Sequence, residues 1–430
     1  MIPLPRSCAR LLPGLLLLLG FTATVHAVAP EFDPIAATGE YLNKLSPEQR
    51  ARSDAYFEGG YWLMLVSLGV TFFLSWLLLN FGVTRKIRDA VEHRIQRPYL
   101  RAWLFILVLS VVLWVLNLPF DAYEGFWREH QYQLSNQTLG AWFGDNLKGL
   151  MVSLVLLPPI AALLYRRIQQ TPDRWWVHAA IAMPFLLVLM LVISPVFIAP
   201  LFNKYTALSE PKMRDPILAM ARANGVPAEH VYQFDASKQH KRVSANVSGA
   251  LGTIRISLND NLLNRASPGG VMAVMGHELG HYVLNHIYRH VVSLGLMFGA
   301  GFWFVHRFYG WVQARWGAAW GLRGIGDLAG LPVLTAGLTL FMFFVTPIRN
   351  TIIRSAEVEA DYFGLNAARE PDAMADVFLM LSEYRKMKPG KWEEILFFDH
   401  PSGYNRILAC MRWKAEHLGG IPPAAPVEKK

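Results

Sequence analysis

The sequence predicts a mainly α-helical protein that crosses a membrane several times. Hydrophobic residues make up 53% of the 430 residues and charged residues only 17%, and the mean hydropathy is +0.26. Several apolar runs reach the roughly 20 residues that a helix needs to cross a bilayer. Basic residues gather in alternate connections between these runs. This combination is typical of a multi-pass membrane protein and not of a soluble one.

Six internal runs are long enough to span a membrane, at residues 61–83, 102–118, 147–165, 176–200, 291–309 and 328–348. A seventh run, LLPGLLLLLGFTATV, opens the chain after Arg6 and Arg10. Val25 and Ala27 then have the small-residue spacing of a cleavage site. Residues 1–27 are therefore predicted to be a secretory signal peptide, with an uncleaved N-terminal anchor as the alternative. The transmembrane helices thus number six or seven.

The spans divide the rest of the chain into membrane and polar segments. Four spans form an N-terminal membrane domain at 28–200, and two more lie at 290–348. The polar segments at 201–289 and 349–420 are expected to be two parts of one domain, which the last two spans interrupt. The end of the chain, 421–430, is low in complexity and is predicted to be a mobile tail.

The net charge of +9 is distributed as in a membrane protein, which argues against a nucleic-acid partner. Three connections between spans are rich in basic residues, namely Arg85, Lys86, Arg88, Arg94, Arg97 and Arg101, then Arg166, Arg167 and Arg174, then Arg307, Arg315 and Arg323. The connection at 119–146 has Arg128 among four carboxylates instead. Basic connections stay in the cytoplasm, so both polar segments are predicted to lie outside it. With the signal sequence, this favours a bacterial inner membrane.

The first polar segment contains two predicted strands and a predicted helix. RVSANVSGA and GTIRISLND alternate like a small β-hairpin around Gly249 and Gly252. A helix then begins at Ser267 and Pro268, because serine caps free amides and proline suits the first helical position. We expect this helix to continue through VMAVMGHELGHYVLNH.

This helix carries the pattern HExxH, which points to zinc. His277 and His281 are four residues apart, so both imidazoles project from one helix face, and Glu278 is placed to reach a metal-bound water. Zinc accepts imidazole nitrogen and carboxylate oxygen, and it keeps one position open for water. We therefore predict one Zn2+ per chain. The alternative is a pair of surface histidines beside a carboxylate.

The best candidate for a third ligand lies in IRSAEVEADYFG, after the last span. Glu357 and Asp361 are four residues apart and share a helix face. Glu357 would then bind the metal while Asp361 supports a ligand histidine from behind. Glu359 points elsewhere. The alternative for the whole acidic group is a solvated helix face.

Three of the histidines beyond the HExxH motif bear on this site. His286 and His290 are expected to continue the HExxH helix as polar residues at the membrane boundary and not as ligands. His400, in FFDHPSGYNRI, could stabilise the oxyanion of a tetrahedral intermediate. From the residues alone, a structural role for His400 is equally favoured.

Together these motifs resemble the type I CaaX prenyl protease family, the integral-membrane zinc proteases that trim prenylated proteins in eukaryotes and have bacterial relatives. The resemblance runs from about Ala55 onward. It includes NLPFDAYEGFWREHQYQLSNQTLGAW, PLFNKYTAL, HELGHYVLNH, EVEAD and a His-Pro pair followed by Arg406.

The resemblance implies a zincin-like catalytic domain and a chamber enclosed by the transmembrane helices. It implies that His277, His281 and Glu357 bind zinc and that Glu278 activates water. Asp361 and His400 are implied to support the ligands or to handle protons. Two residues are assigned to the substrate: Asn246, on an edge strand that would bind an extended peptide, and Arg406, which also helps to organise the site.

Three departures from the family pattern bear on the substrate. A signal-like segment replaces the family's first transmembrane helix. The family's His-Pro-Pro becomes His400-Pro401-Ser402, and its Asn-Ala pair becomes Asn246-Val247. The last two changes touch substrate contacts and put prenylated substrates in doubt, but they leave the zinc pattern intact.

The sequence thus predicts a membrane zinc endopeptidase that cleaves membrane-associated or CaaX-type peptides and proteins, with Glu278 as general base. The first alternative is a quality-control protease for misfolded membrane proteins, without prenyl specificity. The second is a zinc-containing membrane chaperone or scaffold, which needs no general base. A transporter is disfavoured because the spans contain almost no charged residues.

Overall fold

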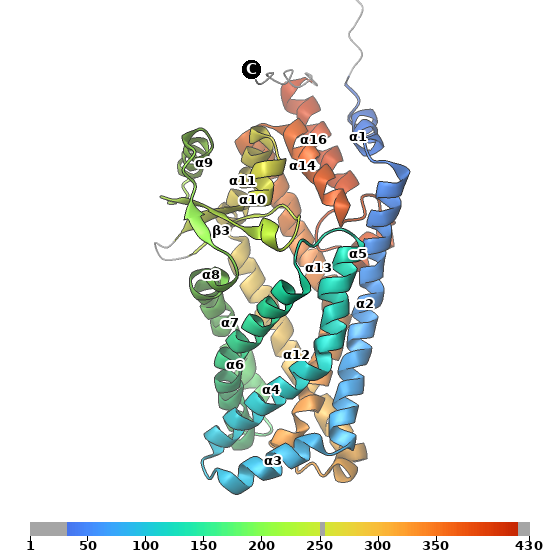
Figure 1. Cartoon of the computed structure of the whole chain (residues 1–430), viewed down its shortest axis with the longest axis vertical. Helices are drawn as coiled ribbons and strands as arrows, with labels where there is room; N and C mark the ends of the chain where they lie inside the picture. Colours follow the sequence, from blue (N-terminus) through green and yellow to red (C-terminus); the bar gives the residue numbers. More distant parts are fainter. Residues whose placement is uncertain (1–31, 250–253, 420–430) are drawn as a thin grey trace, which may run out of the picture.

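The computed structural model describes residues 32–249 and 254–419, and these are mostly helical (Figure 1). The predicted signal peptide, the predicted mobile tail and part of the predicted hairpin turn lie outside the described residues. The expected fold class is confirmed: long helices form one end of the molecule, and a small sheet with shorter helices forms the other.

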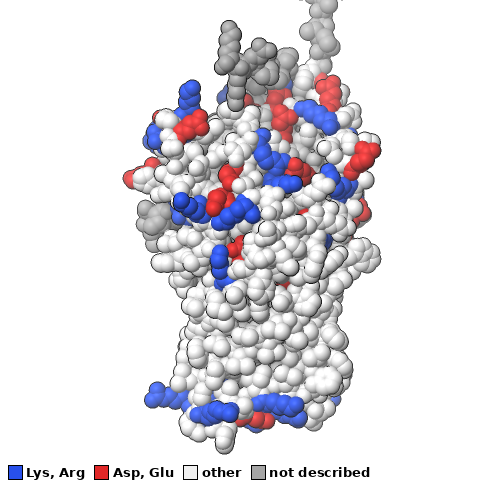
Figure 2. Space-filling view, in the orientation of Figure 1, with Lys and Arg blue, Asp and Glu red and all other residues white. Residues whose placement is uncertain are grey.

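Within residues 32–249 and 254–419, six helices are long and apolar enough to cross a membrane, so the chain is an integral membrane protein. Each of the six predicted runs falls on one of them. These helices are α2 (Pro47–Asn80), α4 (Pro98–Ala122), α6 (Leu139–Gln170), α7 (Trp175–Ile193), α12 (His286–Trp320) and α13 (Leu331–Ala368). Their outer surface forms a wide band without charges (Figure 2). Phe185 of α7 and Leu296 of α12 are 74% and 72% exposed, as expected for lipid-facing side chains.

Below this band, the basic connections meet at one end of the molecule. Helix α3 (Val83–Arg94) lies across that end (Figure 1). Arg323 donates hydrogen bonds to Glu92 and Asp89 of α3, and Gln169 donates to the carbonyl oxygen of Gly326. All three basic connections are therefore side by side, opposite the sheet (Figure 2).

The sheet at the other end has four strands in the order β1-β2-β4-β3. The strands are β1 (Tyr205–Ala207), β2 (Val231–Phe234), β3 (Ala245–Ser248) and β4 (Arg255–Asn259). β3 and β4 pair antiparallel, as the hairpin prediction required, and β4 is parallel to β2. The sheet is larger than predicted. The sequence did not reveal β1 and β2, because they are too short to show an alternating pattern. β3 is the outer strand on the side of the HExxH helix.

Shorter helices surround the sheet. The two polar segments contribute α9 (Pro211–Ala223), α10 (Asp260–Arg265), α11 (Pro268–Val283), α14 (Pro371–Met380), α15 (Lys391–Phe397) and α16 (Gly403–Leu418), and α1 (Pro34–Asn43) joins them from before the first span. One apolar core lies between the sheet, α9 and α11, and another joins α14, α16 and α1. The short elements are η1 (Tyr123–Trp127), α5 (Arg128–Gln131), η2 (Ser194–Ile198), α8 (Ala199–Phe202), η3 (Ala236–Lys238), η4 (Leu328–Gly330) and η5 (Leu381–Glu383).

Helix α11 starts where predicted and ends earlier. The Ser267 side chain accepts a hydrogen bond from the Gly270 amide, and proline follows at the first position. The expectation of one helix running on past His286 is wrong. Asn285 has φ 58° and ψ 32°, a left-handed conformation that asparagine tolerates better than most residues. The chain therefore turns there, and α12 begins at His286.

Candidate metal centre

Helix α11 brings its two motif histidines together. Nε2 of His277 lies 3.1 Å from Nε2 of His281, as the four-residue spacing on one face predicts. His277 is buried, and the side chain of His281 is 26% exposed. Two imidazole nitrogens that face each other this closely leave room for one ion to be bound by both.

Two glycines allow the third ligand helix to approach. A β-carbon on Gly276 of α11 would lie 3.0 Å from backbone atoms of Gly364 of α13, and one on Gly364 would lie 2.8 Å from the His277 amide nitrogen. The two helices thus touch backbone to backbone. Any larger residue at Gly364 would push α13, with its carboxylates, away from the histidines.

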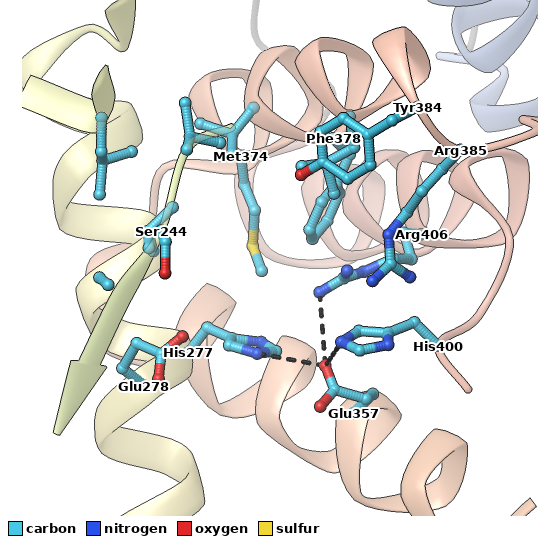
Figure 3. A pocket seen from close by; sticks show the side chains of 16 residues that line it. Ser244, His277, Glu278, Glu357, Met374, Phe378, Tyr384, Arg385, His400 and Arg406 are labelled. Carbon is cyan, nitrogen blue, oxygen red and sulfur yellow. Dashed lines mark ion pairs between the residues drawn. The ribbon is translucent and has the colours of Figure 1, made fainter. Parts of the chain in front are cut away.

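This contact places Glu357 against both histidines, and Figure 3 shows its approach to His277. Its Oε2 is 3.4 Å from Nε2 of His277, and its Oε1 is 3.4 Å from Nε2 of His281. The three residues form a cluster in which one ligand atom from each lies within 4.8 Å of the others. Glu357 is only 6% exposed, so a solvated helix face is the wrong description of this part of α13.

The cluster fits a divalent cation. Oε2 of Glu357 is buried and accepts no well-aligned hydrogen bond from the described residues, although Nε2 of His277 and of His400 lie 3.4 and 3.2 Å away. Burial alone lowers the pKa of His277, but its contacts with the Asp361 and Glu357 carboxylates raise that pKa to about 10. The surroundings therefore favour positive charge between these groups. Two imidazoles and one carboxylate are also the donor set of many catalytic zinc sites, in which water takes the fourth position.

Asp361 lies behind His277, and Arg406 of α16 holds it there. Oδ1 of Asp361 is 2.8 Å from Nδ1 of His277. Arg406 donates two hydrogen bonds to this carboxylate, from Nε at 2.8 Å and from Nη2 at 2.5 Å. All three side chains are nearly inaccessible to solvent. This geometry suits Asp361 to orient His277. The guanidinium group of Arg406 is used to hold Asp361, so its first role is in organising the site and not in contacting a substrate.

Glu278 lines the same cavity as His277 and Glu357, a space of about 270 Å³ (Figure 3). Burial raises the pKa of Glu278, although the two neighbouring histidines oppose this. A carboxylate with a raised pKa beside a cluster of metal-binding groups is suited to take a proton from water.

His400 approaches the cluster from the opposite side. Its Nε2 is 3.2 Å from Oε2 of Glu357, and its Nδ1 is 2.8 Å from Oδ1 of Asp399. Burial and the nearby Arg385 lower the pKa of His400. The sequence left the role of His400 open, and the structure places it at the cavity wall.

Asn246 is the predicted site residue that the structure keeps apart from this cluster. It lies on β3 opposite Ser257 of β4, and it lines a second cavity of about 630 Å³ between the sheet, α7 and α12. Its strand neighbours Ser244 and Ala245 line the cavity of the cluster. β3 thus connects the two cavities.

Sequence reasoning missed four residues that shape this site. Gly276 and Gly364 set the helix contact, Asp399 pairs with His400, and His286 contacts His281. The two glycines stand directly beside motif residues in MGHELGH and YFGLN, which is a usable signal. For the Asp399 and His286 contacts, the local sequence offers no periodicity that would reveal them.

Comparison with known proteins agrees with these features. A model described as CAAX prenyl protease N-terminal, five membrane helices, matches residues 37–204, and the model of peptidase family M48 matches residues 207–414. YhfN of Bacillus subtilis, an uncharacterized metalloprotease, is 29% identical over 366 residues, which covers 84% of this chain and 85% of YhfN.

An Arabidopsis thaliana CAAX prenyl protease 1 homolog is 27% identical over 383 residues, which covers 85% of this chain and 88% of the relative. Among solved structures, a crystal structure of S. mikatae Ste24p superimposes with a TM-score of 0.73 at 21% identity. That likeness covers 86% of this chain and 90% of the other. The two proteins therefore share a fold.

Proposed function

Because the chain belongs to peptidase family M48, as a membrane metalloprotease homologous to CAAX prenyl protease, we propose that it is a zinc endopeptidase acting on peptides presented at a membrane. The observation that carries this proposal is the cluster of His277, His281 and Glu357, together with Glu278, which lines the same cavity as His277 and Glu357. A zinc site with a purely structural role would have no use for the Glu278 carboxylate.

In the proposed reaction, Glu278 is the general base. His277, His281 and Glu357 would hold one zinc ion, which supplies a Lewis acid and lowers the pKa of a bound water towards about 7. Glu278 takes the proton of the attacking water and passes it to the leaving amine. Its raised pKa helps the second transfer, because a more basic carboxylate is more often protonated when the amine departs.

Asp361, Arg406 and His400 act around these groups. Asp361 orients His277, and Arg406 holds Asp361 by two hydrogen bonds. Nε2 of His400 faces the cavity (Figure 3), so a protonated His400 would donate a hydrogen bond to the oxyanion that forms at the scissile carbonyl. Asp399 stabilises that charged form through Nδ1, against the burial and the nearby Arg385 that lower the pKa of His400.

The proposed substrate is an extended peptide that pairs with β3. As the outer strand of the described sheet, β3 offers main-chain groups for a further strand. Ser244 and Ala245 would place such a peptide over the cavity, and Asn246 would face the part of it that enters the second cavity. The relatives' names point to prenylated C-terminal peptides, while the Asn246-Val247 and Pro401-Ser402 departures favour a wider range.

Purified full-length protein, incubated with matched prenylated and unprenylated peptides, tests this proposal. The Glu278→Gln variant serves as the blank for contaminating proteases. We expect both peptides to be cleaved by the wild type and neither by the variant. Cleavage of the prenylated peptide alone would restrict the proposed substrates to prenylated peptides. Equal cleavage by the wild type and the variant would contradict the proposal.

We further propose that the site opens on the extracytoplasmic side of a bacterial inner membrane. The support is the gathering of the three basic connections at the end opposite the sheet (Figure 2), since basic connections are retained in the cytoplasm. A phosphatase that is active only after export, fused after Lys430, should be active. A fluorescent reporter that folds only in the cytosol should stay dark at the same position, and fluorescence there would contradict this orientation.

A further inference from the structure

The turn between α11 and α12 folds His286 back onto the candidate metal centre. Asn285 in its left-handed conformation separates the two helices. His286 is the first residue of α12, and it is only 1% exposed. Its ring lies against that of His281, with centroids 5.0 Å apart and planes at 74°. A polar residue at a membrane boundary would not need to be buried against a motif histidine.

His286 links His281 to an ion pair on the protein surface. Nδ1 of His286 is 2.9 Å from Nδ1 of His281, and Nε2 of His286 is 3.0 Å from Oε2 of Glu359. Arg289 in turn donates hydrogen bonds to both oxygens of Glu359, at 2.9 and 3.2 Å. The chain of contacts runs from His281 to His286, then to Glu359 and to Arg289.

The direction of these hydrogen bonds fixes which nitrogen of His281 carries its proton. A carboxylate only accepts, so Nε2 of His286 donates to Glu359. In a neutral His286, Nδ1 is then an acceptor, and Nδ1 of His281 must donate to it. The lone pair of His281 is left on Nε2, the nitrogen that faces His277 and Glu357. This is the tautomer that binds a metal through Nε2.

We infer that His286, held by Glu359 and Arg289, is a positioning residue that fixes the tautomer and ring rotation of His281 for zinc binding. The inference rests on the proposed zinc site. It gives each ligand histidine a carboxylate–arginine pair behind its Nδ1. His277 contacts Asp361 directly, and Arg406 holds that carboxylate. His281 reaches Glu359 through one additional imidazole.

Zinc affinity of the full-length protein, measured by competition with a chromophoric chelator, tests the inference without using activity. Mutation of a group that hydrogen-bonds to a metal ligand typically lowers metal affinity by about 10–100-fold. We expect the zinc affinity of His286→Ala to fall by about this factor. His286→Asn should restore most of the affinity, because its side-chain oxygen can take the place of the Nδ1 acceptor. Cobalt substitution adds a spectroscopic readout, since a freely rotating His281 would change the absorption bands of the bound ion.

His290→Ala is the matched control. His290 lies one turn further along α12 and lines the second cavity, so its removal should leave zinc affinity unchanged. Equal affinity of wild type and His286→Ala would overturn the inference, as would an equal loss in His290→Ala. If His286→Ala does not fold, Glu359→Ala on the exposed side chain should still weaken zinc binding, and unchanged binding there would overturn it. A wild type without zinc affinity would instead tell against the zinc site itself.

Discussion

Helix α13 has a buried charge cluster at each end, and the two clusters are built differently. Just before its start, Asp327 accepts hydrogen bonds from Nη1 of Arg88 at 2.5 Å and from the amides of Arg323 and Ala329. Arg88 also donates to the carbonyl oxygen of Gly321. Both charged side chains are almost fully buried. Donors and acceptors within the protein satisfy one another at this end.

Near its other end, α13 carries Glu357 and Asp361. Asp361 accepts two hydrogen bonds from Arg406. Oε2 of Glu357 lies 3.2–4.0 Å from nitrogen atoms of His400, His277 and Arg406, but none of the described residues gives it a well-aligned hydrogen bond. A buried carboxylate whose hydrogen bonds are incomplete is costly. The difference supports the proposal that the second cluster binds a cation, whereas the first holds elements of the fold together.

Glu278→Gln tests the second cluster with the largest expected effect. A general base contributes on the order of 10²–10⁴ to the rate, so kcat/KM for peptide cleavage should fall by about that factor. Zinc content and thermal stability should stay at the wild-type level, because Glu278 is neither a proposed ligand nor part of an ion pair in the structure described. A loss of stability equal to that of a core variant would make Glu278 a structural residue.

Arg88→Ala tests the first cluster. Removing one partner of a buried ion pair typically costs 3–5 kcal/mol, and we expect a free energy of unfolding lower by about that amount in detergent solution. Zinc affinity of the folded protein should not change. Arg323→Ala is the matched control: its side chain is 56% exposed in its ion pairs, so its loss should cost only about 0–1 kcal/mol. If both variants lowered the free energy of unfolding equally, the buried Arg88–Asp327 pair would contribute no more to stability than an exposed ion pair.

Asp361→Asn should have a smaller effect, on zinc binding. Without its carboxylate, His277 loses the group that orients it, and zinc affinity should fall by about 10–100-fold. Asp376→Asn serves as control, because Asp376 makes an exposed ion pair with Lys44. If Asp361→Asn lowered stability but left zinc affinity unchanged, the Asp361–Arg406 pair would be structural, like the Arg88–Asp327 pair.

Local patterns in the sequence were sufficient to predict the membrane spans, the start of α11 and Glu357 as the third candidate ligand. Apolar runs of span length, the Ser267-Pro268 start and the four-residue spacing of Glu357 and Asp361 each depend on one segment of chain. Their physical basis is the length of a helix across a bilayer and its 3.6-residue period. All three correspond to features that the structure contains.

Contacts between distant segments could not be read from the sequence. His286 meets Glu359, 73 residues further along the chain, and Arg406 meets Asp361 across 45 residues. No period within one segment encodes such pairs. The break at Asn285 was missed because asparagine is compatible with both a helix and a left-handed turn, and packing of α12 decides between them.

Zinc content most directly tests the central claim that α11 and α13 together form a zinc site. The metal in wild type, Glu357→Ala and Glu416→Ala is to be measured by mass spectrometry after dialysis, with Glu416 as an exposed carboxylate on α16. We expect about one zinc per chain in the wild type and in Glu416→Ala, and almost none in Glu357→Ala, because two imidazoles alone bind zinc weakly. Full zinc content in Glu357→Ala, or none in the wild type, would contradict the account.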